Sequence, residues 1–230
     1  MRKFQWLIWA IVAVILLAGC SVQPMPRTTR PTVQTPAKKE ETKDLQFPCV
    51  LPDGLVAEQL TSYSGPYEED GSGAYVENVA ALTVYNPTQQ MLAFGAFAVE
   101  QAGQTLYFFV QQLPPESRCL LLAYDKKQHD SSEITACREL SIRWEYPDFS
   151  RQQLDYLCLG PEITVINRDS RVLPQVTVWY KSYDRTEDCY IGGIAYAVHL
   201  YDMQPGEYRT VRPEHYDAST GKIVGIELKT

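Results

Sequence analysis

The sequence predicts an all-β fold, and three observations favour it. The chain has 15 Tyr among its 230 residues, and Gly and Pro together supply 28 residues that favour turns. Apolar and polar residues alternate over short stretches, as in Leu140–Tyr146 and Val224–Leu228. Such period-two stretches are typical of strands with one buried face in an antiparallel sheet. Because turn residues separate these stretches every 8–12 positions or so, we expect a β-sandwich.

The size of the chain allows one medium domain or two small ones. Hydrophobic residues make up 45% of the sequence and charged residues 21%, as in ordinary folded domains. The first 19 residues have the character of a targeting segment, and residues 20–46 that of a linker. About 185 residues then remain for the folded part.

The N-terminus has the pattern of a secretory signal. Arg2 and Lys3 precede a nearly unbroken apolar run from Phe4 to Leu17. This run of about 14 residues is shorter than the ~20 residues that a helix needs to cross a bilayer. We therefore predict a signal peptide over residues 1–19.

The end of this run, Leu17-Ala18-Gly19-Cys20, resembles the bacterial lipobox. In lipoproteins with this motif the cysteine receives a diacylglycerol, and the signal peptide is cleaved in front of it. The resemblance implies that Cys20 is the lipidated first residue of the mature chain, held at the extracytoplasmic face of the cell membrane. Two acyl chains suffice for stable anchoring. The alternative is an uncleaved anchor that contains Cys20.

Residues 20–46 predict a flexible spacer. They contain four Pro, several Thr and the charged run Lys38–Asp44, without any apolar periodicity. Such a segment buries too little apolar surface to offset the entropy of ordering it.

The charge excludes some partners. The formal net charge is −7, and it becomes −9 when residues 1–19, with Arg2 and Lys3, are removed. No basic cluster is longer than two residues, so we expect no nucleic-acid binding. The acidic body also disfavours adhesion to anionic lipid, which leaves the lipid on Cys20 as the membrane attachment.

The body contains a weak internal repeat. Leu82–Glu100 matches Ile163–Lys181 at an offset of 81, so that Asn86 corresponds to Asn167. Extra residues around Asp184–Tyr190 then shift the offset to 90, at which Leu113-Pro114-Pro115 matches Met203-Gln204-Pro205. We predict two tandem antiparallel β-sandwich domains, residues 47–152 (the first copy) and 153–230 (the second copy). A single larger sandwich is the alternative.

Both copies resemble the FxLYD-type domain, a small immunoglobulin-like sandwich of bacterial extracytoplasmic proteins. The second copy is the better match, since the first has Pro115-Glu116 without the Gly of that family. The residues that carry this resemblance are Thr164–Asn167, Trp179–Lys181, Ile191–Ile194 and Met203–Glu207. The stretch Val198–Asp202 has the Leu-Tyr-Asp of that family but lacks its Phe. The resemblance implies an extracytoplasmic module without a known active site, so no catalytic residues are carried over.

Five cysteines follow Cys20, an odd number that leaves at least one thiol unpaired within a monomer. Their spacing matches no zinc-binding pattern. Two candidate disulfides are Cys119–Cys137, on consecutive predicted strands, and Cys158–Cys189. The alternative is that these cysteines are small buried apolar residues. The three histidines show no pattern of a cysteine enzyme, and we expect no catalytic activity and no cofactor.

Three further features have a structural and a functional interpretation. The acidic turn Glu68–Gly73 could ligate Ca²⁺, but a hairpin turn is favoured and no metal site is predicted. Gly192-Gly193 predicts a bulge or a close turn. The aromatic residues of the second copy favour a core over a ligand platform; they are Trp179, Tyr180, Tyr183, Tyr190, Tyr196 and Tyr201.

The sequence thus predicts a membrane-anchored, non-catalytic lipoprotein that binds an unknown protein or small ligand at the cell envelope. The alternative is a structural or assembly component that works through sheet-edge contacts. An exposed aromatic patch beside Gly192-Gly193 would favour ligand binding. A long free edge strand would favour assembly.

Overall fold

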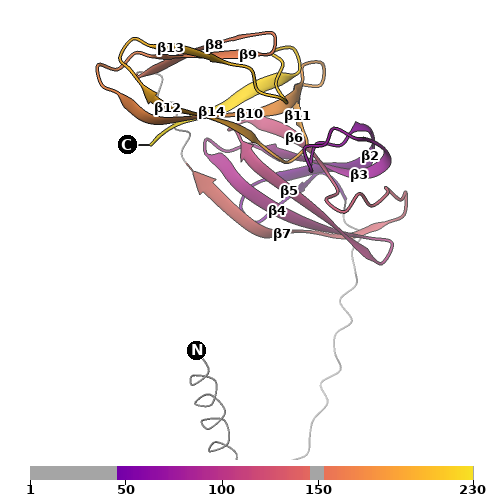
Figure 1. Ribbon diagram of the computed structural model, residues 1–230. Helices are drawn as coiled ribbons and strands as arrows, with labels where there is room; N and C mark the ends of the chain where they lie inside the picture. The colour runs from indigo at the N-terminus through magenta and orange to yellow at the C-terminus, as the bar shows by residue number, and fades with distance from the viewer. Residues whose placement is uncertain (1–45, 146–152, 230) are drawn as a thin grey trace, which may run out of the picture. The chain divides into compact units, whose positions relative to one another are not determined.

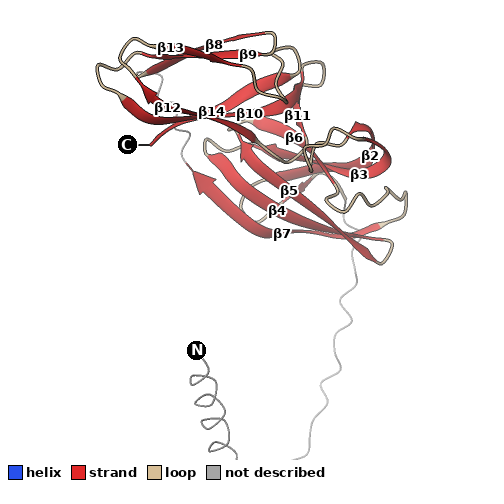
Figure 2. Cartoon of the chain, in the orientation of Figure 1, coloured by secondary structure: helices blue, strands red, loops and turns tan. Residues whose placement is uncertain are grey.

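The computed structural model describes residues 46–145 and 153–229, which all belong to one compact unit of the chain. These residues form 14 strands and no helix, which confirms the all-β fold class (Figures 1 and 2). None of the described segments is a helix long and apolar enough to span a membrane. The predicted signal peptide, Cys20 and the linker up to residue 45 lie outside the described residues.

The first copy is built from two antiparallel sheets of three strands each. The first has the order β2-β3-β6, and the short β1 (Cys49–Val50) pairs with its strand β2. The second has the order β5-β4-β7. The strands of the first sheet are β2 (Val56–Pro66), β3 (Tyr75–Asn86) and β6 (Ser117–Leu122). Those of the second are β4 (Met91–Gln101), β5 (Gln104–Leu113) and β7 (Ile134–Glu145).

The second copy repeats this arrangement. Its outer sheet has the order β13-β9-β8, and its other sheet places β10 between β12 and β14. The strands of the outer sheet are β8 (Leu154–Leu159), β9 (Glu162–Asn167) and β13 (Tyr208–Val211). The remaining strands are β10 (Leu173–Asp184), β12 (Tyr196–Met203) and β14 (Gly221–Lys229). These six strands therefore correspond in order to six strands of the first copy. The sequence repeat predicts the pairs from β3 and β9 to β7 and β14, and the structure adds the pair β2 and β8.

Each copy has its own cluster of buried apolar side chains between its sheets. In the first copy, Leu82 and Val84 of β3 face Phe97 of β4 and Phe108 of β5. In the second, residues of β9 such as Ile163 pack with Val176, Val178 and Leu200. Burial of alternate side chains explains why the period-two pattern was visible in the sequence.

The asparagines of the repeat make the same hydrogen bonds in both copies. Asn86 Nδ2 donates to the carbonyl oxygens of Gln90, Leu113 and Pro114 at 2.9, 3.3 and 3.0 Å. Asn167 Nδ2 donates to those of Arg171, Met203 and Gln204 at 2.9, 3.0 and 3.1 Å. Both side chains are fully buried, and each connects the turn after its own strand to the turn that precedes β6 in the first copy or β13 in the second. The two asparagines that correspond in the sequence therefore also make corresponding hydrogen bonds.

The extra residues of the second copy form β11 (Cys189–Ile191), which has no counterpart in the first copy. This strand pairs antiparallel to β10 and parallel to β6, with Tyr190 opposite Cys119. It joins strands of both copies into one sheet of eight, in the order β1-β2-β3-β6-β11-β10-β12 with β14 beside β10 (Figure 1). The predicted domain boundary at residue 152 lies outside the described residues, and the division into two domains stays a prediction.

Candidate binding site at the junction of the two copies

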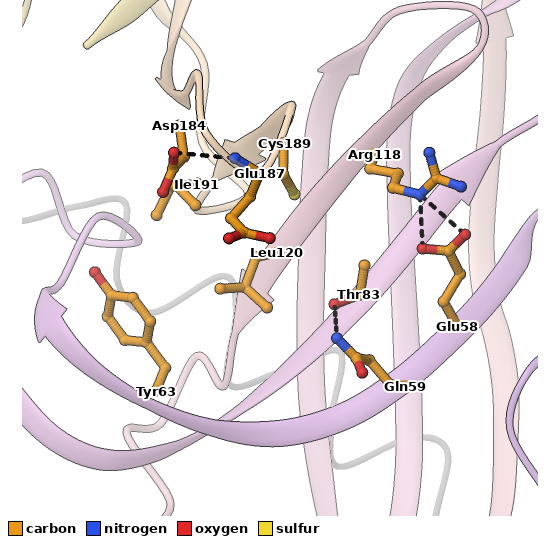
Figure 3. Close-up of a pocket in the computed structure, with 10 residues that line it drawn as sticks. All are labelled: Glu58, Gln59, Tyr63, Thr83, Arg118, Leu120, Asp184, Glu187, Cys189 and Ile191. Carbon is orange, nitrogen blue, oxygen red and sulfur yellow. Dashed lines mark hydrogen bonds and ion pairs between the residues drawn. The ribbon is translucent and has the colours of Figure 1, made fainter.

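A pocket of about 460 Å³ lies on the outer face of the joined sheet, where β11 meets the first copy (Figure 3). Strand alternation determines which side chains face it: Arg118 and Leu120 line the pocket, whereas Cys119 and Leu121 face the core. The lining residues come from the strands β2, β3, β6, β10 and β11 and from the segment between β10 and β11. They are Glu58, Gln59, Tyr63, Thr83, Arg118, Leu120, Asp184, Glu187, Cys189 and Ile191.

One side of the pocket carries a satisfied ion pair. Arg118 Nε donates to both carboxylate oxygens of Glu58, at 3.0 and 2.9 Å. Its guanidinium also lies 4.6 Å from the centre of the Tyr85 ring. The hydrogen bond to Glu58 raises the pKa of Arg118, so this cation stays charged and paired at all ordinary pH values.

The opposite side of the pocket is acidic. The Asp184 carboxylate accepts hydrogen bonds from the backbone N–H groups of Thr186 (2.8 Å) and Glu187 (3.2 Å), which fixes the turn before β11. The carboxylate of Glu187 extends over Leu120 and forms no ion pair with any described residue (Figure 3). With three carboxylates against one guanidinium, the pocket has an excess of negative charge.

The remaining polar groups of the pocket are neutral. Tyr63 donates its hydroxyl hydrogen to the carbonyl oxygen of Pro66 at 2.9 Å, and burial together with Glu68 raises its pKa. Burial raises the pKa of the Cys189 thiol to about 11, so this group is protonated at neutral pH. A protonated thiol is a poor nucleophile and a poor metal ligand. Within residues 46–145 and 153–229, no group of three or more His, Cys, Asp and Glu side chains could hold a metal ion.

Buried charged groups hold the two copies together beside the pocket. The carboxylate of Glu69 accepts hydrogen bonds from the backbone N–H groups of Leu122 and Gly193, each at 2.8 Å. Lys181 Nζ donates to the carbonyl oxygens of Gly193 (2.9 Å) and Ile194 (2.7 Å). Burial raises the pKa of Glu69 and lowers that of Lys181, while their mutual attraction opposes both shifts. These bonds satisfy groups that would be costly to bury alone.

The acidic turn Glu68–Gly73 is the hairpin connection between β2 and β3, as favoured from the sequence. The sequence did not reveal that its side chains reach the second copy. Besides the bonds of Glu69, Glu68 Oε2 accepts hydrogen bonds from Ser182 Oγ at 3.0 Å and Tyr196 Oη at 3.4 Å. The only signal was Lys181, a charged residue directly after the apolar and aromatic run Val178–Tyr180.

At Gly192-Gly193 two backbones approach each other closely, whereas the sequence predicted a bulge or a close turn. A Cβ on Gly193 would lie 1.7 Å from the carbonyl oxygen of Phe109, so no other residue fits without movement of the chain. Both glycines are buried, and the neighbouring Tyr190 is only 2% exposed. The exposed aromatic patch that would favour ligand binding is therefore not at this turn.

The aromatic residues of the second copy serve mainly as core. Tyr180, Tyr183 and Tyr190 are buried, Trp179 and Tyr196 are half-buried, and Tyr201 is exposed. Stacking of Tyr180 on Tyr196, with ring centroids 5.4 Å apart, extends the core towards the junction.

All five cysteines of the body are free thiols in the structure, so neither candidate disulfide is formed. Cys119 is buried and donates to the carbonyl oxygen of Gly192 at 3.2 Å. Cys137, paired with Cys119 in the sequence-based prediction, interacts with the side chain of Cys49. Cys158 interacts with the side chain of Tyr216, and Cys189 lines the pocket. Cys20 lies outside the described residues.

No family model, no curated protein and no solved structure matches the chain. The lipobox and the FxLYD-type resemblance rest on the quoted residues alone and stay predictions. The function has to be inferred from those residues and from the junction pocket.

Proposed function

We propose that the chain is a lipid-anchored extracytoplasmic binding protein that holds a small cationic ligand in the junction pocket. The observation that carries the ligand class is the excess negative charge of this pocket, where Glu187 forms no ion pair with any other described residue. Leu17-Ala18-Gly19-Cys20 carries the location, with acylated Cys20 as the anchor and residues 21–46 as the spacer. The proposed role is non-catalytic.

The pocket has the size and chemistry for a small ligand with an ammonium or guanidinium group. Its volume of about 460 Å³ falls within the usual range of small-molecule sites, roughly 300–1,000 Å³. The Glu187 and Asp184 carboxylates can accept charge-assisted hydrogen bonds from such a cation. Leu120 and Ile191 offer an apolar surface for the carbon chain that carries the charge.

The ligand class can be tested by calorimetric titration of the detergent-solubilised full-length chain with agmatine, which carries an ammonium and a guanidinium group. Pentanamide, which is uncharged, is the reference probe. We expect agmatine binding to weaken roughly three- to tenfold in Glu187→Gln, because an accessible charge–charge contact in a pocket is worth only a modest amount. Glu227→Gln, on the exposed face of β14, is the matched control and should bind as the wild type does. Equal binding of both probes would refute a cationic ligand.

The anchor can be tested by fractionation of cells that express Cys20→Ala, with Cys158→Ala as the control. We expect the Cys20→Ala protein to leave the membrane fraction or to remain an uncleaved precursor, whereas the control should stay with the membrane. A Cys20→Ala protein of mature size that still fractionates with membrane would contradict anchoring through this residue.

A second candidate is the structural or assembly role, which one observation favours. Along one side of β8 no described strand pairs, and Leu157 and Leu159 of this strand are 62% and 73% exposed. Another edge strand, β7, carries charged side chains and three register irregularities, features that protect an edge from pairing. A photo-crosslinking residue at Leu159 that captures one defined envelope protein, while one at Glu227 does not, would favour this role.

A further inference from the structure

Two edge strands of the first copy meet at one side of its sandwich. β1 is the outermost strand of the eight-stranded sheet, and β7 is an outer strand of the sheet β5-β4-β7. The turn after β1 lies against β7, because the backbone N–H of Asp53 donates to the Glu139 carboxylate at 3.1 Å. Each of these strands contributes one cysteine, Cys49 and Cys137, and both side chains pack against the same apolar cluster.

The two thiols are neighbours. The side chains of Cys49 and Cys137 lie close enough for each to shift the pKa of the other, although the residues lie far apart in the sequence and in different sheets. Both side chains are only partly buried, so that a soluble reagent can reach them. Cys119 and Cys189, by contrast, are buried. Proximity, accessibility and positions on two opposed edges distinguish this pair from the other thiols of the described residues.

We propose that Cys49 and Cys137 form a disulfide that closes the first copy along this side. The disulfide arises by exchange with a disulfide donor, either a small molecule or a thiol-oxidising protein. The Cys49 thiolate attacks one donor sulfur and releases the other as a thiolate. The Cys137 thiolate then attacks the Cys49 sulfur and displaces the second donor sulfur. The two protons of the cysteines end on the donor, which is reduced to two thiols while the protein is oxidised by two electrons.

The direction of attack follows from the surroundings of the two thiols. Burial raises the pKa of both, that of Cys137 to about 12, but the neighbouring Cys137 side chain partly offsets the rise at Cys49. Cys49 therefore supplies the first thiolate. Its oxidation in the cell depends on the extracytoplasmic location proposed above, since reducing compartments keep thiols free.

Closure of this bond should have a large effect on stability. The cross-link would join the first strand of the body to the last strand of the first copy and enclose a loop of roughly 90 residues, for which the unfolded state loses much of its entropy. We expect the oxidised chain to melt about 10 °C above the reduced chain. This comparison uses only the wild type, so it does not depend on whether a variant folds.

The chemistry is tested by incubation of the purified, folded full-length chain in detergent with oxidised glutathione, followed by alkylation and mass spectrometry without reduction. We expect a linked pair of peptides containing Cys49 and Cys137, about 2 Da lighter than their sum because two hydrogens are lost. Cys49→Ser and Cys137→Ser should abolish this species and the melting shift, whereas the control Cys158→Ser should keep both. Linkage of any other pair, or free Cys49 and Cys137 after excess oxidant, would overturn the proposal.

The location is tested separately, by trapping thiols with N-ethylmaleimide in intact cells before lysis. A Cys49–Cys137 bond in the trapped protein supports both proposals. If the bond forms in purified protein while both thiols are trapped free in cells, the pairing stands and the extracytoplasmic location fails.

Discussion

The first and second copies build the same sandwich but differ in how their two middle strands are connected. In the first copy, β4 passes into β5 through only Ala102 and Gly103, both in the left-handed region that tight hairpins require. In the second copy, residues 185–195 separate β10 from β12 and include β11. The pocket, the buried glycines and the carbonyl oxygens that Lys181 contacts all belong to this longer connection or border on it. The candidate site thus lies where the second copy departs from the repeat.

The largest expected effect concerns Gly193, in the longer connection of the second copy. Gly193→Ala would place a Cβ against the Phe109 carbonyl oxygen, and backbone must move to relieve the clash. We expect a loss of about 4 kcal/mol or more in the free energy of unfolding, measured with urea. Gly225→Ala is the control: its Cβ meets only Trp179, at 3.8 Å, and should change stability little. If both substitutions lowered the free energy of unfolding equally, the backbone at Gly193 would be able to move away from the added Cβ at little cost.

Asn86 and Asn167 test what the copies share. Substitution of either by Ala removes the donor to three carbonyl oxygens at a buried turn, and we expect each to cost about 2–3 kcal/mol. Urea unfolding of both variants measures the difference. If one substitution costs far more than the other, the equivalence of the two turns is only geometric.

The buried Glu69, which connects the first copy to the second, predicts a pH dependence of stability. Burial raises its pKa above the ordinary value of 4.5, so the folded state binds this proton more tightly than the unfolded state does. The free energy of unfolding should therefore decrease as the pH rises from about 4.5 through the folded-state pKa. Glu69→Gln should flatten this decline relative to the wild type, whereas Glu227→Gln should not. Parallel curves for all three proteins would contradict the raised pKa.

The smallest expected effect concerns the turn before β6 in the first copy and the equivalent turn before β13 in the second. Glu116 and Gly206 occupy the same position of the repeat, with φ of 53° and 73°. Gly206→Ala should cost about 1 kcal/mol, because a side chain is strained in the left-handed region. Glu116→Gly should stabilise by roughly 0.5 kcal/mol or less, since relief of strain is offset by the entropy of glycine. Thermal unfolding of the two variants should show a lower melting temperature for Gly206→Ala and an equal or slightly higher one for Glu116→Gly.

Much of the fold could be predicted from the sequence because it depends on local patterns. Period-two stretches located strands in both copies, and the recurrence of Asn86 as Asn167 located equivalent turns. Alternation along a strand decides which side chains are buried. An asparagine at a turn forms hydrogen bonds with the backbone of that turn.

The candidate site could not be predicted, because it depends on contacts between distant residues. The parallel pairing of β11 with β6 joins segments about 70 residues apart, and no local pattern specifies it. Glu69 looked like part of a solvated turn, although its carboxylate is buried against Gly193. The partner of Cys137 was sought on the neighbouring strand of the chain, whereas the sandwich brings the first strand of the body to it.

The dependence of β6 on β11 has a consequence for the newly made chain. β6 has β3 on one side and β11 on the other, and β11 follows β6 by about 70 residues. If the first copy folds before the second, this edge of β6 stays uncovered until β11 pairs with it. An open strand edge during that interval is a template for pairing with another chain. The order in which the two copies fold therefore decides how long the first copy is exposed to such pairing.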